Sequence, residues 1–283
     1  MLPAPCRPLL TAVAVAISTV TMGACGSDPA GPTAGGTSAA DRTAEQGRRL
    51  PGLPPDFVRV RDVIPQALFE IRYHGDHNFI GRPVRGYSAP ECWLTRRAAE
   101  AMAGVQERVA QRGYRLKFYD CFRPRRAVSE FASWARDPKA TAMKAEFYPT
   151  LEKNELFPKG YIAAKSGHSR GSTLDVTLVR RGDGLSPDWR PGDPLVACTA
   201  PVGERFADTS IDMGTGFDCF NPRANTANPA IRGSARANRR YLVREMSRAG
   251  FENLPEEWWH YTLRNEPYPN TYFDAEITSG TGR

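Results

Sequence analysis

Residues 166–179 read SGHSRGSTLDVTLV, a loop rich in Gly and Ser that runs directly into an apolar segment. The second half, TLDVTLV at 173–179, is rich in β-branched residues and predicts a β-strand. Asp175 is the only acidic residue of this strand, and a buried carboxylate without a partner is strongly destabilising. We therefore expect Asp175 to have a charged or hydrogen-bonding partner in the folded protein.

Outside this segment, two stretches rich in aromatic or β-branched residues predict strands, YRLKFYD at 114–120 and WWHYTLR at 258–264. Apolar residues at helical spacing predict three helices, at 96–112, 125–136 and 235–249. Strands and helices do not alternate in strict βαβ order. We therefore expect an α+β fold, a single domain with a small, mainly antiparallel sheet packed by helices.

Three residues mark where these helices begin. Thr95 and Ser234 can act as N-caps of the first and third helices, because a hydroxyl can accept a hydrogen bond from a free backbone N–H. Pro124 suits the first turn of the second helix. Gly113 and Gly250 are expected to end the first and third helices.

The composition excludes several classes of protein. Of the 283 residues 41% are hydrophobic, which can fill a core, and 25 Gly with 24 Pro exclude a coiled coil or a helical bundle. The net charge is +7, but basic and acidic residues are interleaved without a run of five like charges. We expect no nucleic-acid partner and no obligate protein partner.

The N-terminus has the features of an export signal. Leu9–Val20 is an apolar stretch of 12 residues after Arg7, too short for a comfortable transmembrane helix. Met22-Gly23-Ala24-Cys25 resembles a bacterial lipobox, so we expect residues 1–24 to be a lipoprotein signal peptide and Cys25 to be lipidated. The alternative is ordinary secretion with Cys25 unmodified.

The residues after Cys25 are mostly Gly, Ala, Ser, Thr and Pro up to residue 55. Such a composition is typical of a flexible linker, which would hold a domain away from a membrane. We therefore expect a lipidated Cys and linker at 25–55 and a folded domain at 56–283. The expected location is outside the cytoplasm, attached to the bacterial membrane through the lipid alone.

Four cysteines fall in the predicted domain, Cys92, Cys121, Cys198 and Cys219. An even number in an exported domain indicates two disulfides, and three pairings are possible. We favour Cys92 with Cys121 and Cys198 with Cys219. A zinc site made of these thiols is the weaker alternative, because none lies in a Cys-x-x-Cys pair.

Two of the four histidines have chemically suggestive neighbours. His168 lies in the loop before Asp175, and His260 follows Glu257 in the aromatic segment EWWHY. Two imidazoles and a carboxylate are suitable ligands for Zn²⁺ and leave a fourth position open, while Glu257 could act as a base. The alternative is structural: core histidines and an ion-paired Asp175. We interpret His74 and His77 as loop residues.

The segment DCFRPRRAV at 120–128 joins a predicted strand to a helix N-terminus. An arginine placed there could stabilise an oxyanion, although a surface role is the alternative. Spacing alone does not rank Arg123 above Arg125.

Several of these segments together resemble one family of enzymes. SGHSRGSTLDVTL, EWWHY and DCFRPRRAV, together with HNFIGRPVRGY at 77–87, MGTGFD at 213–218 and NEPYPNTYFD at 265–274, resemble the VanX-type D-alanyl-D-alanine dipeptidases. These form a branch of the zinc D,D-peptidases, and the similarity runs from about Phe57 to Asp274. The resemblance implies a fold of the hedgehog/D,D-peptidase type.

The resemblance also implies roles for individual residues. His168, Asp175 and His260 would hold one Zn²⁺ ion, Glu257 would be the catalytic base, and Arg123 would stabilise the oxyanion. Ser166, Tyr73 and Asp218 match positions that bind the dipeptide substrate.

The function that follows is hydrolysis of the D-Ala-D-Ala dipeptide by a metal-activated water, in cell-wall dipeptide turnover. One alternative is a D,D-carboxypeptidase that acts on peptidoglycan stem peptides, which would need an open groove at the ammonium end. The other is a zinc-containing wall-binding lipoprotein without catalysis. Glu257 argues against this last reading, because a pure binder needs no base beside the metal.

Overall fold

A five-stranded sheet forms the centre of the part of the chain that the computed structural model describes, residues 49–280. Only the first pair in the sheet is parallel, and the other three pairs are antiparallel. The mainly antiparallel sheet is therefore confirmed. In spatial order the strands are β2 (Leu68–Phe69), β4 (Tyr114–Asp120), β5 (Thr173–Arg180), β7 (His260–Leu263) and β6 (Phe251–Asn253).

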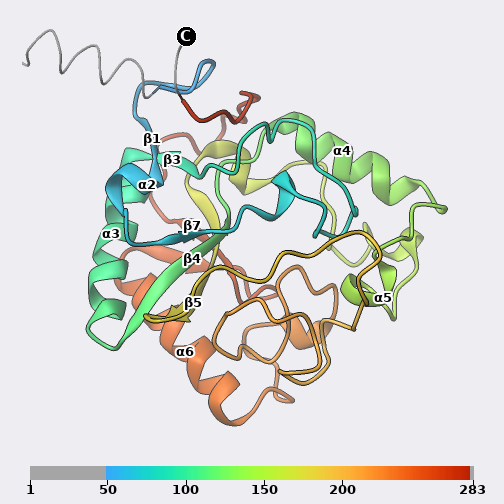
Figure 1. Cartoon of the computed structure of the whole chain (residues 1–283). Helices are drawn as coiled ribbons and strands as arrows, with labels where there is room; N and C mark the ends of the chain where they lie inside the picture. The colour runs from blue at the N-terminus through green and yellow to red at the C-terminus, as the bar shows by residue number, and fades with distance from the viewer. Residues whose placement is uncertain (1–48, 281–283) are drawn as a thin grey trace, which may run out of the picture. The chain divides into compact units, whose positions relative to one another are not determined.

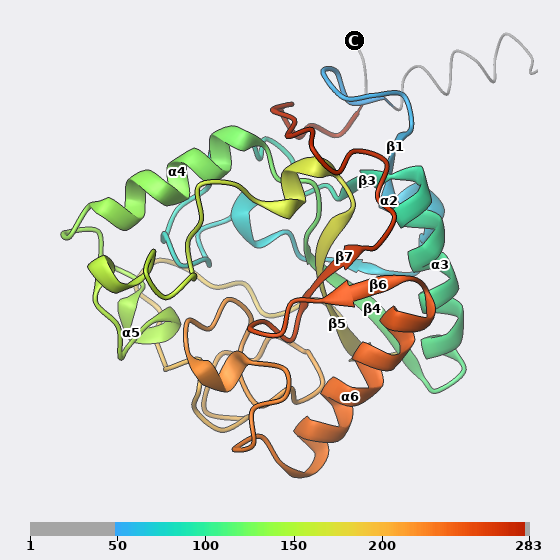
Figure 2. The same ribbon diagram turned by 180° about the vertical axis from the view of Figure 1, so that it is seen from behind.

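Helices lie on both sides of this sheet (Figure 1). In both views α3 and α6 lie together on one side, and α4 and α5 lie on the other (Figure 2). A second, two-stranded antiparallel sheet pairs β1 (Phe57–Arg59) with β3 (Trp93–Thr95). The helices are α2 (Val60–Val63), α3 (Arg96–Ala110), α4 (Arg125–Arg136), α5 (Lys144–Phe147) and α6 (Gly233–Arg248). The α+β class is therefore confirmed.

The sequence patterns predicted the starts of two of the three helices correctly. Thr95 caps α3, since its side chain accepts a hydrogen bond from the Ala98 N–H, and α4 follows Pro124 directly. The prediction that Ser234 caps the third helix was wrong. The carbonyl of Arg232 already accepts from the Arg236 N–H, so α6 begins at Gly233 and Ser234 lies in its first turn.

The predicted strand at 258–264 is shorter in the structure. Trp258 and Trp259 precede β7 in a turn, where the His260 N–H donates to the Glu257 carbonyl. Both tryptophans are nevertheless buried at 1% exposure. Their aromatic character reflects packing in the core instead of strand pairing.

Both favoured disulfides are present in the structure, Cys92–Cys121 and Cys198–Cys219. The Cα atoms are 5.2 Å apart in the first and 5.5 Å in the second, within the usual range for such bonds. The competing idea of a zinc site made of these four thiols is therefore wrong.

The predicted signal peptide, Cys25 and most of the predicted linker lie outside the described residues. Leu50, inside the predicted linker, is buried at 3% exposure and packs in the core. The beginning of the domain at residue 56 stays a prediction. Among residues 49–280, no helix is both long and apolar enough to span a membrane.

Glu70, directly after β2, is the acidic centre of a buried ion cluster. Its carboxylate accepts from Lys117 Nζ at 3.0 Å and lies 2.8 Å from Arg72 Nε. Burial acts to raise the pKa of Glu70, but the charges of Arg72 and Lys117 outweigh burial and lower the pKa to about 2. An unfolded Glu has a pKa of about 4.3, so this stabilisation is present above that pH and is lost as the pH falls toward 2.

Replacing Glu70 by glutamine should lower the free energy of unfolding by about 3 kcal/mol at neutral pH, because Lys117 and Arg72 then stay buried without their counter-charge. Urea unfolding measures this loss, and the difference from wild type should shrink at about pH 3. Glu100→Gln, at an exposed position of α3, is the matched control. Equal stability of the Glu70→Gln and wild-type proteins at neutral pH would contradict the account.

Candidate active site

The register of the central strands brings three functional side chains to one place. Asp175 of β5 lies opposite His260 of β7 and, on its other side, opposite Asp120 of β4. His168 comes from the short 3-10 helix η3 (Gly167–Arg170), which Ser166 caps by accepting from the His168 N–H. Gly171 ends η3 with φ +83°, where a Cβ would collide with the ring of Phe57.

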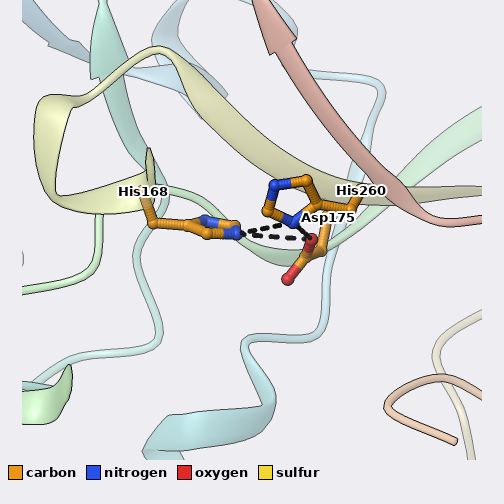
Figure 3. Close-up of side chains that lie close together, drawn as sticks. All are labelled: His168, Asp175 and His260. Atoms are coloured by element: carbon orange, nitrogen blue, oxygen red, sulfur yellow. Dashed lines mark hydrogen bonds and ion pairs between the residues drawn. The ribbon is translucent and has the colours of Figure 1, made fainter. Parts of the chain in front are cut away.

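The side chains of His168, Asp175 and His260 point toward one another (Figure 3). His260 Nδ1 lies 3.1 Å from Asp175 Oδ1 and 3.2 Å from His168 Nε2, and His168 Nε2 lies 3.4 Å from Asp175 Oδ1. Zinc ligands at about 2.0–2.1 Å in tetrahedral geometry are roughly 3.3 Å apart. The three atoms therefore fit the ligand set of a single metal ion.

One hydrogen bond prepares His168 for this role. Its Nδ1–H donates to the Cys121 carbonyl oxygen at 2.7 Å, and since a carbonyl only accepts, the proton must be on Nδ1. Nε2 then carries a free lone pair toward the cluster. A metal ligand oriented in this way by a backbone carbonyl is common in metalloproteins.

The charges of the cluster also suit a cation. Burial acts to raise the pKa of Asp175, but His168 and His260 outweigh burial and hold the pKa below its usual range. Burial and the Arg123 charge lower the pKa of His168 below its ordinary value, although Asp175 opposes them. Burial acts to lower the pKa of His260, but its hydrogen bond with Asp175 raises the pKa overall. A proton and a metal ion therefore compete for His260 Nδ1.

Glu257 lies beside the cluster, with Oε2 at 3.5 Å from His260 Nδ1. Burial and the neighbouring Asp175 raise the pKa of Glu257, although His260 opposes them. A carboxylate with a pKa shifted toward neutrality can both accept and donate a proton near pH 7. Glu257 therefore lies next to the three candidate ligands, and its role as a base stays a prediction.

Arg123 is held in place by acidic and aromatic neighbours. Its Nε donates to Asp120 Oδ2 at 2.8 Å, and Nη2 lies 3.5 Å from Asp175 Oδ2. The guanidinium carbon lies 5.0 Å from the ring centroid of Tyr73 and 5.1 Å from that of Phe131. Arg123, and not Arg125, therefore lies against the cluster of His168, Asp175 and His260, which resolves the choice that spacing left open.

The cluster opens into a cavity of about 200 Å³. Ser166, Tyr73 and Asp218, the three residues expected to bind substrate, all line it together with Arg123 and Glu257. Tyr73 donates to Asp218 Oδ2 at 2.7 Å, and burial together with the charge of Asp175 raises the pKa of Asp218 well above its usual value. The volume is below that of typical pockets for drug-sized ligands, so the cavity suits a small molecule.

Sequence reasoning missed two residues of the site. Asp120 is fully buried, and it accepts hydrogen bonds from Arg123 and from the Tyr87 hydroxyl, the latter at 2.8 Å. Asp120 ends a predicted strand just as Asp175 lies within one, so an acidic residue in an apolar strand was the available signal. Tyr87 had no comparable signal.

The two other histidines lie outside the ligand cluster. His74 ends the short 3-10 helix η1 (Arg72–His74) and contacts the Tyr87 carbonyl. His77 is buried, and its Nε2 lies 3.0 Å from Glu146 Oε1. His77 therefore lies in a loop, as the sequence led us to expect, with its side chain buried, whereas His74 belongs to a 3-10 helix. Neither belongs to the cluster of His168, Asp175 and His260.

The Cys198–Cys219 disulfide adjoins Asp218, whose backbone has a strained φ of +53°. Replacing both cysteines by alanine should lower the free energy of unfolding by roughly 3 kcal/mol, as for other loops of this length. Urea unfolding of the double variant and of the wild-type protein measures this loss, and equal stability of the two would contradict the expected contribution of the disulfide.

These groups form the type of centre that metal-dependent hydrolases use: a set of nitrogen and oxygen ligands, an adjacent carboxylate and a fixed arginine in a small cavity. The sequence model of a peptidase family, the D-ala-D-ala dipeptidases, matches residues 55–188 and 207–278 of this chain. The chain therefore belongs to this family of metal-dependent dipeptidases.

Individual relatives agree with this assignment. The chain is 35% identical over 221 residues to the D-alanyl-D-alanine dipeptidase of Enterococcus faecium and 36% identical over 222 residues to that of Streptomyces coelicolor. Each comparison covers 78% of this chain and 98% of the relative. The D-alanyl-D-alanine dipeptidase of Escherichia coli is 24% identical over 229 residues.

Proposed function

We propose that this protein is a zinc-dependent D-alanyl-D-alanine dipeptidase. The observation that carries the proposal is the convergence of His168, Asp175 and His260 beside Glu257 in a cavity of about 200 Å³. The names of the relatives support the choice of D-Ala-D-Ala as substrate. Two imidazoles and one carboxylate with an open fourth position favour zinc among the common metals.

A bound zinc ion would supply a Lewis acid that activates a water molecule and polarises the scissile carbonyl. Glu257 takes the proton of the attacking water and passes it to the leaving amine. Burial raises the pKa of Glu257, which makes its carboxylate a stronger base and still allows it to return the proton to the amine.

Arg123 stabilises the negative charge that develops on the carbonyl oxygen. Asp120 and Asp175 fix its guanidinium, and both are buried, so little reorganisation is needed during the reaction. The rings of Tyr73 and Phe131, whose centroids lie 5.0 and 5.1 Å from the guanidinium carbon, further limit its movement.

The ends of the dipeptide are bound by different groups. Asp218, hydrogen-bonded to Tyr73, binds the substrate ammonium. Burial raises the pKa of Asp218, and the ammonium supplies the positive charge that stabilises its ionised form. The Ser166 hydroxyl binds the other end of the dipeptide, near the substrate carboxylate. A buried group that pairs with a free ammonium selects dipeptides over longer chains, because a longer chain has no charge at that point.

We also propose that the protein acts outside the cytoplasm, attached to the membrane through lipidated Cys25, in the turnover of cell-wall dipeptides. Support comes from the lipobox-like residues 22–25, the linker composition and the two disulfides, which form in oxidising compartments. Mass spectrometry of the protein extracted from membranes would detect the lipid on Cys25, and an unmodified Cys25 would contradict the anchor.

Incubating the zinc-loaded protein with D-Ala-D-Ala and with a pentapeptide that ends in D-Ala-D-Ala tests the proposed activity. We expect free D-Ala from the dipeptide only. Release from the pentapeptide would support the D,D-carboxypeptidase alternative instead. A folded zinc protein that is inert toward both would support the wall-binding alternative.

A further inference from the structure

A second cavity adjoins the active-site cavity. Its volume is about 410 Å³, and it shares three wall residues with the first cavity, Val128, Lys165 and Ser166. The two cavities therefore border one another at Ser166. A dipeptide of two alanines would not need this additional space.

The second cavity is lined by two cationic residues, Lys165 and Arg125, and by no acidic residue. Within residues 49–280, neither cation forms a side-chain ion pair, and Lys165 Nζ lies 5.4 Å from the ring centroid of Tyr272. Asp274 is close enough for Arg125 to affect its pKa, but its carboxylate already accepts hydrogen bonds from Arg126. The cavity thus offers positive charge that no neighbouring carboxylate fully neutralises.

The charges of the two cavities indicate how a substrate lies across them. Asp218 and Tyr73 line only the first cavity, where a carboxylate favours the substrate ammonium. Lys165 and Ser166 line the wall that the cavities share, where an ammonium group and a hydroxyl favour the substrate carboxylate. The second cavity therefore continues from the C-terminal residue of the dipeptide.

We propose that the second cavity is a subsite for an anionic side chain on the second residue of the substrate. D,D-dipeptides that end in an acidic residue such as D-glutamate are then hydrolysed in preference to neutral dipeptides of equal length. Arg125 is the specificity-determining residue, since it lines this cavity alone. The inference rests on the proposed D,D-dipeptidase activity and deepens it.

The test compares kcat/KM of the zinc-loaded full chain for D-Ala-D-Glu and D-Ala-D-Gln, whose side chains have equal length, with D-Ala-D-Ala as reference. We expect a preference for D-Ala-D-Glu of about fivefold, the upper end for an ion pair with an exposed cation such as Arg125, expressed mainly in KM. The preference should fall at high salt and approach one in Arg125→Gln. Arg97→Gln, an exposed arginine of α3 that lines neither cavity, should retain it.

Equal kcat/KM values for the two substrates, with D-Ala-D-Ala still hydrolysed, would overturn the subsite and leave the proposed function intact. A preference that Arg125→Gln does not reduce would also overturn it. Failure to hydrolyse D-Ala-D-Ala as well would overturn the proposed function and the subsite together.

Discussion

Replacing Glu257 by alanine is expected to lower kcat for D-Ala-D-Ala by about 10³-fold, because no other carboxylate beside the ligands can take the proton of the attacking water. Asp218 lines the same cavity but is bound to Tyr73, and Asp120 is bound to Arg123 and Tyr87. None of the three converging ligand atoms belongs to Glu257. The Glu257→Ala protein should therefore still bind one zinc ion per chain.

Steady-state kinetics and metal analysis of the same sample measure both parts of this prediction. Glu256→Ala is the matched control, since Glu256 precedes Glu257, is exposed and does not line the cavity. A Glu257→Ala protein with normal turnover would show that another group is the base. A variant that lost its zinc would show that Glu257 acts on metal binding and not on proton transfer alone.

Arg123→Lys is expected to lower kcat by about 10²-fold with little change in KM, because its role is to stabilise charge that exists only in the transition state. Lysine keeps the positive charge near Asp120 and Asp175 but loses the rigid fork of donors. Because the charge is retained, Asp120 and Asp175 keep a positive partner, and the variant should bind zinc better than an alanine variant would.

Kinetics at saturating and limiting D-Ala-D-Ala, with zinc content and the thermal midpoint, check this prediction. Arg136→Lys, at the far end of α4, should behave as wild type. An Arg123→Lys variant with a raised KM and an unchanged kcat would place Arg123 in ground-state binding, and wild-type kinetics would remove it from the mechanism.

The regular elements were predictable where local signals were strong. The helix at 125–136 and the strand at 114–120 were predicted with their observed bounds, because a proline, apolar spacing and a run of aromatic residues act over a few positions. The start of α6 was missed, because an N-cap residue is favoured but not required and the backbone of Arg232 already begins the helix. Trp258 and Trp259 suggested a strand because burial in a core and pairing in a sheet favour the same aromatic residues.

The ligands of the site were predictable because their types are chemically unusual in their surroundings. Asp175 is acidic within an apolar strand, and His168 and His260 are two of only four histidines. Asp120 and Tyr87 were missed because their roles depend on tertiary structure. Asp120 lies opposite Asp175 through the strand register, and the hydroxyl of Tyr87, which lies far from both in the sequence, donates to Asp120. The second cavity depends on segments near residues 125, 165 and 270, which only the fold brings together.

The most direct test of the central claim is the rate of D-Ala release from D-Ala-D-Ala by the protein after removal of its metal and after addition of one equivalent of zinc. We predict no release from the metal-free protein, and release of two D-Ala per dipeptide once His168, Asp175 and His260 are occupied. Equal rates with and without zinc, or no release from the folded, zinc-loaded protein, would contradict the account.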